Sequence, residues 1–180
     1  MWWRNALIGA ALLALAGCGF HALYGRQSVD PRVQSEMATI YVQPLPDREG
    51  QLVRNAILQR LNPNGQPAHA RYRLDVKLEV SEAQVALAKD ETATRDSVNY
   101  VVTFTLYEGD TGLTNGTFSR DFSFDYLNQQ YSNVVARSDV QRRAAEEIAI
   151  EMRNRMATYF VRAQEAHAAA EGQQPANSNP

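Results

Sequence analysis

Hydrophobic and charged residues alternate most regularly between residues 72 and 80. Apolar side chains occupy the even positions and charged side chains the odd positions, in the order Tyr-Arg-Leu-Asp-Val-Lys-Leu-Glu-Val. A period of two is typical of a β-strand with one buried and one solvated face, whereas a helix would scatter these apolar residues around its circumference. Residues 81–95 lose the alternation and gain charged residues, so we expect the strand to end in an exposed loop there.

Two further strands are predicted downstream. The even positions from Val98 to Leu106 are apolar, and so are those from Phe118 to Tyr126, except Arg120. Between them, the sequence Gly-Asp-Thr-Gly at 109–112 predicts a hairpin turn, because glycine adopts the positive φ that such turns require. Residues 72–126 are therefore predicted to form an antiparallel meander with one apolar face, which another element must cover.

A short strand and a helix are predicted ahead of the meander. Residues 37–44 are rich in β-branched and apolar side chains, and Pro44 and Pro46 stop this strand. From residue 48 to residue 61 apolar side chains recur at four-residue steps, which predicts a helix with one apolar face. Asp47 is expected to cap that helix at its N-terminus.

A long helix is predicted near the C-terminus. It is expected to begin at Ser138, because Ser138 and Gln141 have the spacing of a capping box. Its apolar residues then recur at intervals of three or four: Val140, Ala144, Ile148, Met152, Met156, Tyr159 and Ala163. Such a stripe can bind a partner, but opposite an uncovered sheet it more often belongs to the core. Strands and helices in this order predict an α+β fold.

The N-terminal segment has the layout of a secretory signal. Residues 1–5 contain one cation, Arg4, and residues 6–16 form a continuous apolar run rich in Leu and Ala. The sequence Leu-Ala-Gly-Cys at 15–18 follows the pattern of a bacterial lipobox, in which the cysteine is acylated and becomes the new N-terminus. We expect Cys18 to carry a lipid anchor, because a thiolate is well suited to form the thioether with a lipid donor.

Two other interpretations of this segment are weaker. A transmembrane helix needs about 20 apolar residues, and the apolar run stops at Cys18. A buried structural cysteine does not explain the small residues before Cys18, which also has no disulfide partner because the chain contains no other cysteine. The residue after Cys18 is Gly19 rather than an acidic residue, which favours transfer to the outer membrane.

The chain is predicted to hold one globular domain between two tails. Residues 1–17 are assigned to a signal peptide, and residues 18–36 to the lipidated cysteine and a tether in which Asp30-Pro31 breaks any regular structure. Residues 37–166 are assigned to the domain. Residues 167–180 end in a polar, proline-containing stretch and are expected to be a disordered tail.

Composition and motifs argue against several function classes. Removing residues 1–17 removes one of the 18 Lys and Arg residues and none of the 20 acids, so the net charge changes from −2 to −3. That balance gives no basic stripe for nucleic acid. His21, His69 and His167 have no metal-ligand spacing around them, and no phosphate loop or nucleophile elbow is present. We therefore expect that the protein is not an enzyme and that it has no cofactor beyond the covalent lipid on Cys18. The alternative is a catalytic site made of paired carboxylates that folding brings together.

The residues around the lipobox resemble the start of a known family. The sequence Leu-Ala-Gly-Cys-Gly-Phe-x-x-Leu-Tyr-Gly at 15–25 is similar to that of LptE, the lipopolysaccharide-assembly lipoprotein of the outer membrane, in its alphaproteobacterial form. The order strand, helix, three strands and long helix also resembles the LptE domain. The resemblance implies a two-layer sandwich, in which two helices pack on a mixed four-stranded sheet. It further implies a plug inside the LptD barrel, which inserts lipopolysaccharide into the outer leaflet.

The resemblance also suggests which residues contact lipopolysaccharide. In the family these are basic residues, and Lys89, Arg95 and Arg120 are the plausible counterparts in this chain. Such side chains can pair with the phosphates of lipid A through charge-assisted hydrogen bonds. The alternative for each is a solvated surface cation. Arg120 shares the phase of Phe118 and Phe122, so it must reach the edge of the sheet, a carboxylate or a partner.

Three functional hypotheses follow. The first is a non-enzymatic lipoprotein at the periplasmic face of the outer membrane, anchored by its lipid, that stabilises and plugs an LptD-like barrel and binds lipopolysaccharide. The second is a periplasmic lipoprotein that binds a soluble partner or an envelope polymer without a barrel. The third, with the least support, is a lipid-anchored hydrolase. Co-purification of a large barrel would separate the first from the other two.

Overall fold

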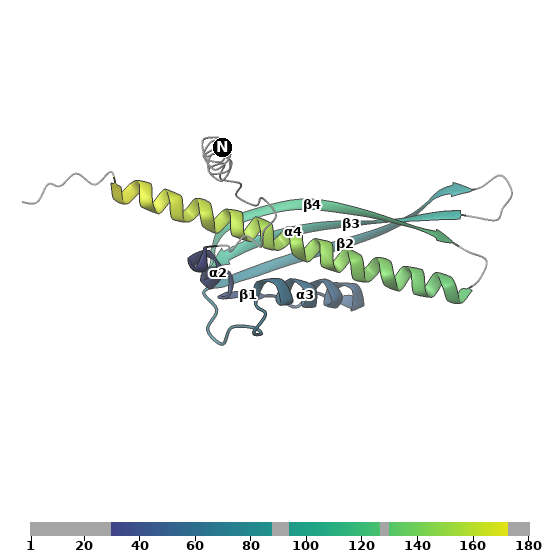
Figure 1. Cartoon of the computed structure of the whole chain (residues 1–180), viewed down its shortest axis with the longest axis horizontal. Coiled ribbons are helices and arrows are strands. Elements are labelled where there is room, and N and C mark those ends of the chain that lie inside the picture. Colours follow the sequence, from purple (N-terminus) through teal and green to yellow (C-terminus); the bar gives the residue numbers. More distant parts are fainter. Residues whose placement is uncertain (1–29, 88–93, 127–129, 173–180) are drawn as a thin grey trace, which may run out of the picture.

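The computed structural model describes residues 30–87, 94–126 and 130–172 (Figure 1). Within these ranges the elements are α2 (Pro31–Met37), β1 (Ile40–Val42), α3 (Asp47–Leu61), β2 (Tyr72–Leu87), β3 (Thr94–Glu108), β4 (Thr111–Tyr126) and α4 (Gln130–Gly172). The strands form one sheet in the order β1-β2-β3-β4, with β1 parallel to β2 and the other pairs antiparallel. The predicted α+β fold, with a mixed four-stranded sheet and an antiparallel meander, is confirmed.

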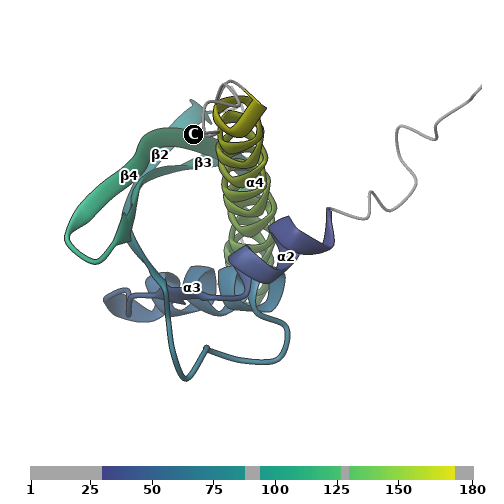
Figure 2. The ribbon, with the colours of Figure 1, turned by 90° about the vertical axis from the view of Figure 1, so that its left-hand side faces the viewer.

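The helices cover one face of the sheet. In Figure 2 the sheet curves around one side of the molecule, and α3 and α4 lie on its inner side. The even-numbered residues of the strands face these helices, and Leu74, Val102 and Leu106 are completely buried. Ile148 and Met152 of α4 are completely buried against them. The alternation along the strands and the stripe along α4 therefore meet in one core, as predicted.

The strands are longer than the sequence predicts. β2 continues to Leu87 and β3 begins at Thr94, so most of the loop predicted at 81–95 is a continuation of the β2–β3 ladder, with an irregularity near Gln84. β4 begins at Thr111 rather than at Phe118. Cross-strand pairing supplies the reason, because backbone hydrogen bonds continue the ladder where the side chains no longer alternate.

The predicted tether ends in a helix instead of irregular chain. Asp30 is the N-cap of α2, and its Oδ1 accepts a hydrogen bond from the backbone N–H of Arg32 at 2.8 Å. Pro31 occupies the first helical position, where the missing N–H has no intrahelical partner to lose. The two apolar residues of α2, Val33 and Met37, are buried. Asp30-Pro31 thus starts a helix, and the packed structure begins ahead of residue 37.

The start of α3 also differs from the prediction. The N-cap position is Pro46, which offers no side-chain cap, and Asp47 is the first helical residue with a φ of 60°. That left-handed conformation is more accessible to Asp than to most residues, because its short polar side chain tolerates it. The predicted apolar face is confirmed, since Val53, Ile57 and Leu61 are buried.

α4 is longer than predicted at both ends. It begins at residue 130, so Ser138 and Gln141 lie inside the helix and do not form a capping box. At the other end, residues 167–172, which the sequence assigns to a disordered tail, are helical. Residues 173–180 lie outside the described residues, so the disorder predicted there stays a prediction. Figure 1 shows α4 running the whole length of the meander.

Candidate interaction site on β4 and α4

Four residues were singled out by the sequence, and the structure describes the side chain of one. Cys18 and Lys89 lie outside the described residues. Arg95 lies in β3, where its backbone is paired with both neighbouring strands, and its side chain is outside the description. Arg120 lies in β4, and its side chain joins a cluster of charged and aromatic residues on β4 and α4.

Arg120 occupies a core-facing position, yet its charge is held at the rim of the sandwich. Its Nη2 donates to Oε2 of Glu151 on α4 at 3.0 Å, and its Nη1 donates to the backbone oxygen of Ser119 at 2.9 Å. The side chain is 34% exposed. Arg120 therefore reaches a carboxylate, one of the three outcomes expected from its phase, and the ion pair offsets the cost of a cation among phenylalanines.

A second arginine, which the sequence analysis did not single out, binds the same carboxylate. Arg155 Nε donates to Oε1 of Glu151, one turn away on α4, at 2.8 Å. The guanidinium carbon of Arg155 lies 4.9 Å from the ring centroid of Phe118 and 5.8 Å from that of Phe104, within the range of cation–π contacts. The i,i+4 spacing could have revealed the pair on α4. The contact between this pair and Arg120 depends on how α4 packs on β4, and no local sequence pattern shows that packing.

Gly116 of β4 provides the space for the Phe104 ring, over which Arg155 lies. A Cβ atom added at this position would lie 3.0 Å from two ring carbons of Phe104 and 3.5 Å from Nη1 of Arg155. Any side chain here would displace the Phe104 ring, which packs into the core. The close packing of the Phe104 ring against β4 therefore depends on a residue without a side chain, whereas 3.5 Å to Arg155 is an ordinary van der Waals distance.

The cluster carries a net positive charge. Two guanidinium groups, from Arg120 and Arg155, share the single carboxylate of Glu151. A guanidinium has five N–H donors, and the contacts above use one donor of Arg155 and two of Arg120. The other donors have no acceptor among the described residues. Chemically, this arrangement suits a further anionic group, either a carboxylate or a phosphate.

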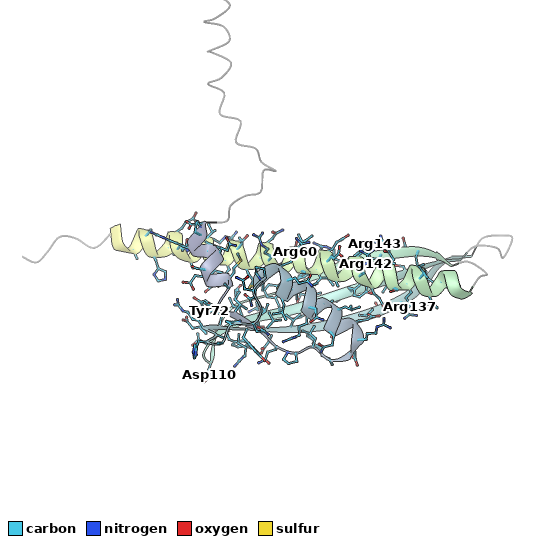
Figure 3. All side chains as sticks on the ribbon, turned by 60° about the horizontal axis from the view of Figure 1, so that its bottom comes forward. Arg60, Tyr72, Asp110, Arg137, Arg142 and Arg143 are labelled. Carbon is cyan, nitrogen blue, oxygen red and sulfur yellow. The ribbon has the colours of Figure 1, made fainter. Side chains whose placement is uncertain are left out.

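A second polar group surrounds Tyr72, which is labelled in Figure 3, and includes Glu36 of α2. The hydroxyl of Tyr72 donates to Oε2 of Glu36 at 3.0 Å, and Arg71 pairs with Glu36 and, at 2.7 Å, with Glu108. Burial raises the pKa of Tyr72 to about 12, and the hydrogen bond to Glu36 adds to this shift. These contacts join α2, β2 and β3, which indicates a structural role.

A cavity of about 420 Å³ lies between α3, β2 and α4. Its walls are the first turn of α3, Leu78 and Val80 of β2, and Gln141 of α4. The Gln141 amide donates to Oε1 of Glu49 across it at 2.6 Å. The described residues contain no group of three or more His, Cys, Asp or Glu side chains placed to hold a metal ion. Among the helices described, none is both long and apolar enough to cross a bilayer.

Sequence comparison finds relatives that cover most of the chain. The model of the LptE family, described as lipopolysaccharide-assembly, matches residues 37–162. An uncharacterized protein of Rickettsia prowazekii is 26% identical over 150 residues, which cover 82% of this chain and 92% of that protein. The match of the family model includes β1, α3, the meander and most of α4.

Solved structures share the fold at lower identity. A Caulobacter crescentus protein classed as a lipoprotein has a TM-score of 0.60 and 22% identity, and the match covers 73% of this chain and 97% of that chain. A minor lipoprotein from Acinetobacter baumannii has a TM-score of 0.50 and 14% identity, with 66% and 88% covered. Both comparisons support the arrangement of sheet and helices described above.

Proposed function

Because the chain belongs to the LptE family of lipopolysaccharide-assembly proteins, we propose that it is a non-enzymatic outer-membrane lipoprotein that stabilises and plugs an LptD-like β-barrel. The barrel then inserts lipopolysaccharide into the outer leaflet, and the domain occupies the barrel from its periplasmic side. The observation that carries this proposal is the family match over residues 37–162, which spans the whole described sheet.

The lipid on Cys18 is the proposed membrane anchor. After removal of residues 1–17, Cys18 would be the first residue of the mature chain, followed by Gly19. Twelve peptide units separate Cys18 from Asp30, so a fully extended connection spans at most about 40 Å. This reach keeps α2 and the β1 end of the sheet close to the membrane surface, where a barrel opens to the periplasm.

Direct contact with lipopolysaccharide is proposed for Lys89 and Arg95. Each carries a positive charge that suits the phosphates of lipid A. Arg120 is the weaker candidate for this contact, because Glu151 already offsets part of its charge.

Affinity purification from detergent-solubilised membranes tests the function. The tagged full chain would be co-expressed with the LptD barrel of the same genome, and we expect a large, heat-modifiable barrel to be retained. Cys18→Ala is the matched variant: it should lose outer-membrane fractionation in a strain without the barrel and keep barrel binding, because the anchor and the plug are separate parts. Wild-type chain that retains no barrel would contradict the proposal and favour a periplasmic lipoprotein with a soluble partner or envelope polymer.

A further inference from the structure

Within the described part of the chain, β4 is an open edge of the sheet, and it is sixteen residues long. It pairs with β3 on one side, and no described strand pairs with its other side (Figure 1). In an antiparallel ladder, every second residue directs both its N–H and its C=O away from the neighbouring strand. Such a row of unpaired groups is a template for an additional strand.

Between residues 117 and 121, the outward-facing backbone groups of β4 belong to Thr117, Ser119 and Asp121. The side chains of Thr117 and Asp121 make hydrogen bonds of 3.2 and 2.7 Å with the residues opposite them on β3. Such close side chains are typical of positions that are not joined by backbone hydrogen bonds. The carbonyl of Ser119, between them, accepts a hydrogen bond from the Arg120 guanidinium, as an outward carbonyl can.

The β1 edge of the same sheet is covered by the chain itself. The side-chain amide of Gln66 binds the N–H of Val42 at 3.3 Å and its C=O at 3.0 Å, so it takes the place of a neighbouring strand. The amide of Asn62 donates to the C=O of Ile40 at 2.7 Å. Among the described residues, β4 has no comparable cover apart from the contact at the Ser119 carbonyl. The open edge is therefore particular to β4.

The net positive charge of Arg120, Arg155 and Glu151 favours an added strand with an acidic side chain at this edge. A strand added to β4 places one side chain directly opposite Arg120, with the two Cβ atoms about 5 Å apart. An Asp or Glu at that position would accept hydrogen bonds from the guanidinium groups that share Glu151. A Lys or Arg there would add a third cation, and an apolar residue would leave the excess charge unpaired.

A second copy of this chain that pairs through its own β4 does not supply that carboxylate. When two copies pair antiparallel through β4 in one continuous sheet, core-facing residues lie opposite core-facing residues. From residue 114 to residue 124 these are Thr114, Gly116, Phe118, Arg120, Phe122 and Phe124, none of which is acidic. Pairing centred on Arg120 would also oppose two arginines. A dimer formed through β4 therefore does not match the charge of this edge.

We propose that an extended segment of the barrel partner pairs as an additional strand with residues 117–121 of β4. An acidic residue of that segment lies opposite Arg120. This inference rests on the proposed function, because the barrel protein supplies the segment. Backbone hydrogen bonds along the edge give the affinity, and the carboxylate fixes the register against Arg120 and Arg155.

Substitutions on the full-length chain, co-expressed with the barrel, test the strand addition. Ser119→Pro removes one outward N–H at a position where an edge strand tolerates proline, and Ser119→Ala keeps that N–H as the matched control. We expect barrel retention to fall about tenfold or more for proline and to stay unchanged for alanine. Arg120→Gln combined with Arg155→Gln should lower retention by a similar factor, since a charge-assisted hydrogen bond contributes at least about tenfold in affinity. The melting temperatures of the purified chains check the fold.

Photo-crosslinking provides a second, independent test. A photoreactive amino acid at Thr117 or Asp121 should capture an acidic segment of the barrel, identified by mass spectrometry. The same probe at Thr103, on the same face of the central strand β3, should capture less. Three results would overturn the strand addition but not the proposed function. They are undiminished retention of the barrel by Ser119→Pro, adducts formed only from Thr103, and adducts with lipopolysaccharide instead of polypeptide. Wild-type chain that retains no barrel would overturn the proposed function and this inference with it.

Discussion

The two edges of the sheet expose the same kind of backbone groups and treat them differently. β1 is three residues long, and side chains of Asn62 and Gln66 bind its polar groups. β4 is sixteen residues long, and among the described residues its outer edge has no such cover beyond the Ser119 carbonyl. A covered edge contributes to the stability of the free chain, whereas an open edge contributes only when a partner pairs with it.

Burial follows the same division. Ile40 and Val42 of β1 are completely buried, whereas Phe118 and Phe122 of β4 keep 8% of their surface exposed and Arg120 keeps a third. The β1 edge is therefore part of the core, and the β4 edge lies at its margin. We infer that stability is concentrated at the β1 edge and binding capacity at the β4 edge.

Truncation of a β1 residue should have a far larger effect on stability than truncation of an outward β4 residue. Ile40→Ala removes methyl groups that are completely buried and should lower the free energy of unfolding by about 2 to 5 kcal/mol. Thr117→Ala, on exposed β4, should change it by about 0.5 kcal/mol or less. Urea unfolding of the two purified variants measures both. Equal losses would show that the edges do not differ in the way described.

The side-chain amides that cover β1 should also contribute measurably. Asn62 is 4% exposed, so Asn62→Ala leaves the buried carbonyl of Ile40 without its donor and should cost about 1 to 3 kcal/mol. Asn99→Ala is the matched change near β4, because it removes an exposed hydrogen bond to Asp121, and it should cost about 0.5 kcal/mol. Denaturant unfolding compares the pair. If Asn99→Ala lowered the free energy of unfolding as much as Asn62→Ala, the hydrogen bonds that cover the β1 edge would not be a special source of stability.

The faces of the strands could be predicted from the sequence, but the relations between elements could not. Strict alternation at 72–80 assigned the buried face of β2 correctly. The same pattern does not show how far the helices reach over that face: exposure rises from 0% at Leu74 to 38% at Val80, and Val76 between them is only partly buried. The 420 Å³ cavity lies beside Leu78 and Val80 for the same reason. How far the helices extend over the face of β2 is decided by tertiary packing, and the local sequence of the strand does not show it.

Local signals with two meanings explain the errors at the element ends. Asp-Pro commonly interrupts regular structure, but the same pair provides an N-cap and a first helical residue, as in α2. Ser138 and Gln141 have capping-box spacing inside a helix that continues through them. For the candidate site, the phase of Arg120 predicted correctly that it needs a partner. Glu151 was not predicted as that partner, because the distance between β4 and α4 is set by the fold.

High pH should weaken the β1 side through Tyr72. Burial and the hydrogen bond to Glu36 raise the pKa of Tyr72 from 10.0 to about 12, so the folded chain holds this proton more tightly than the unfolded chain. Its contribution is complete below pH 10 and is lost as pH rises toward 12. Tyr72→Phe should remove this part of the pH dependence. The contribution of Tyr100, whose burial also raises its pKa to about 12, should remain in that variant. Urea unfolding between pH 9 and pH 12 measures the slope, and an unchanged slope in Tyr72→Phe would contradict the assignment.

Glu151→Gln should separate binding at the β4 edge from its stability. The change removes a partly exposed carboxylate, so we expect the free energy of unfolding to change by no more than about 1 kcal/mol. Because the net charge of the cluster then rises by one, an acidic segment should bind as well as before or more tightly, and barrel retention should become more sensitive to salt. Glu147→Gln, an exposed change on the same helix, controls for the altered charge of α4. If Glu151→Gln lost the barrel to the same extent as the combined Arg120→Gln and Arg155→Gln change, the cluster would act only by holding α4 on β4, and recognition of an acidic segment would be wrong.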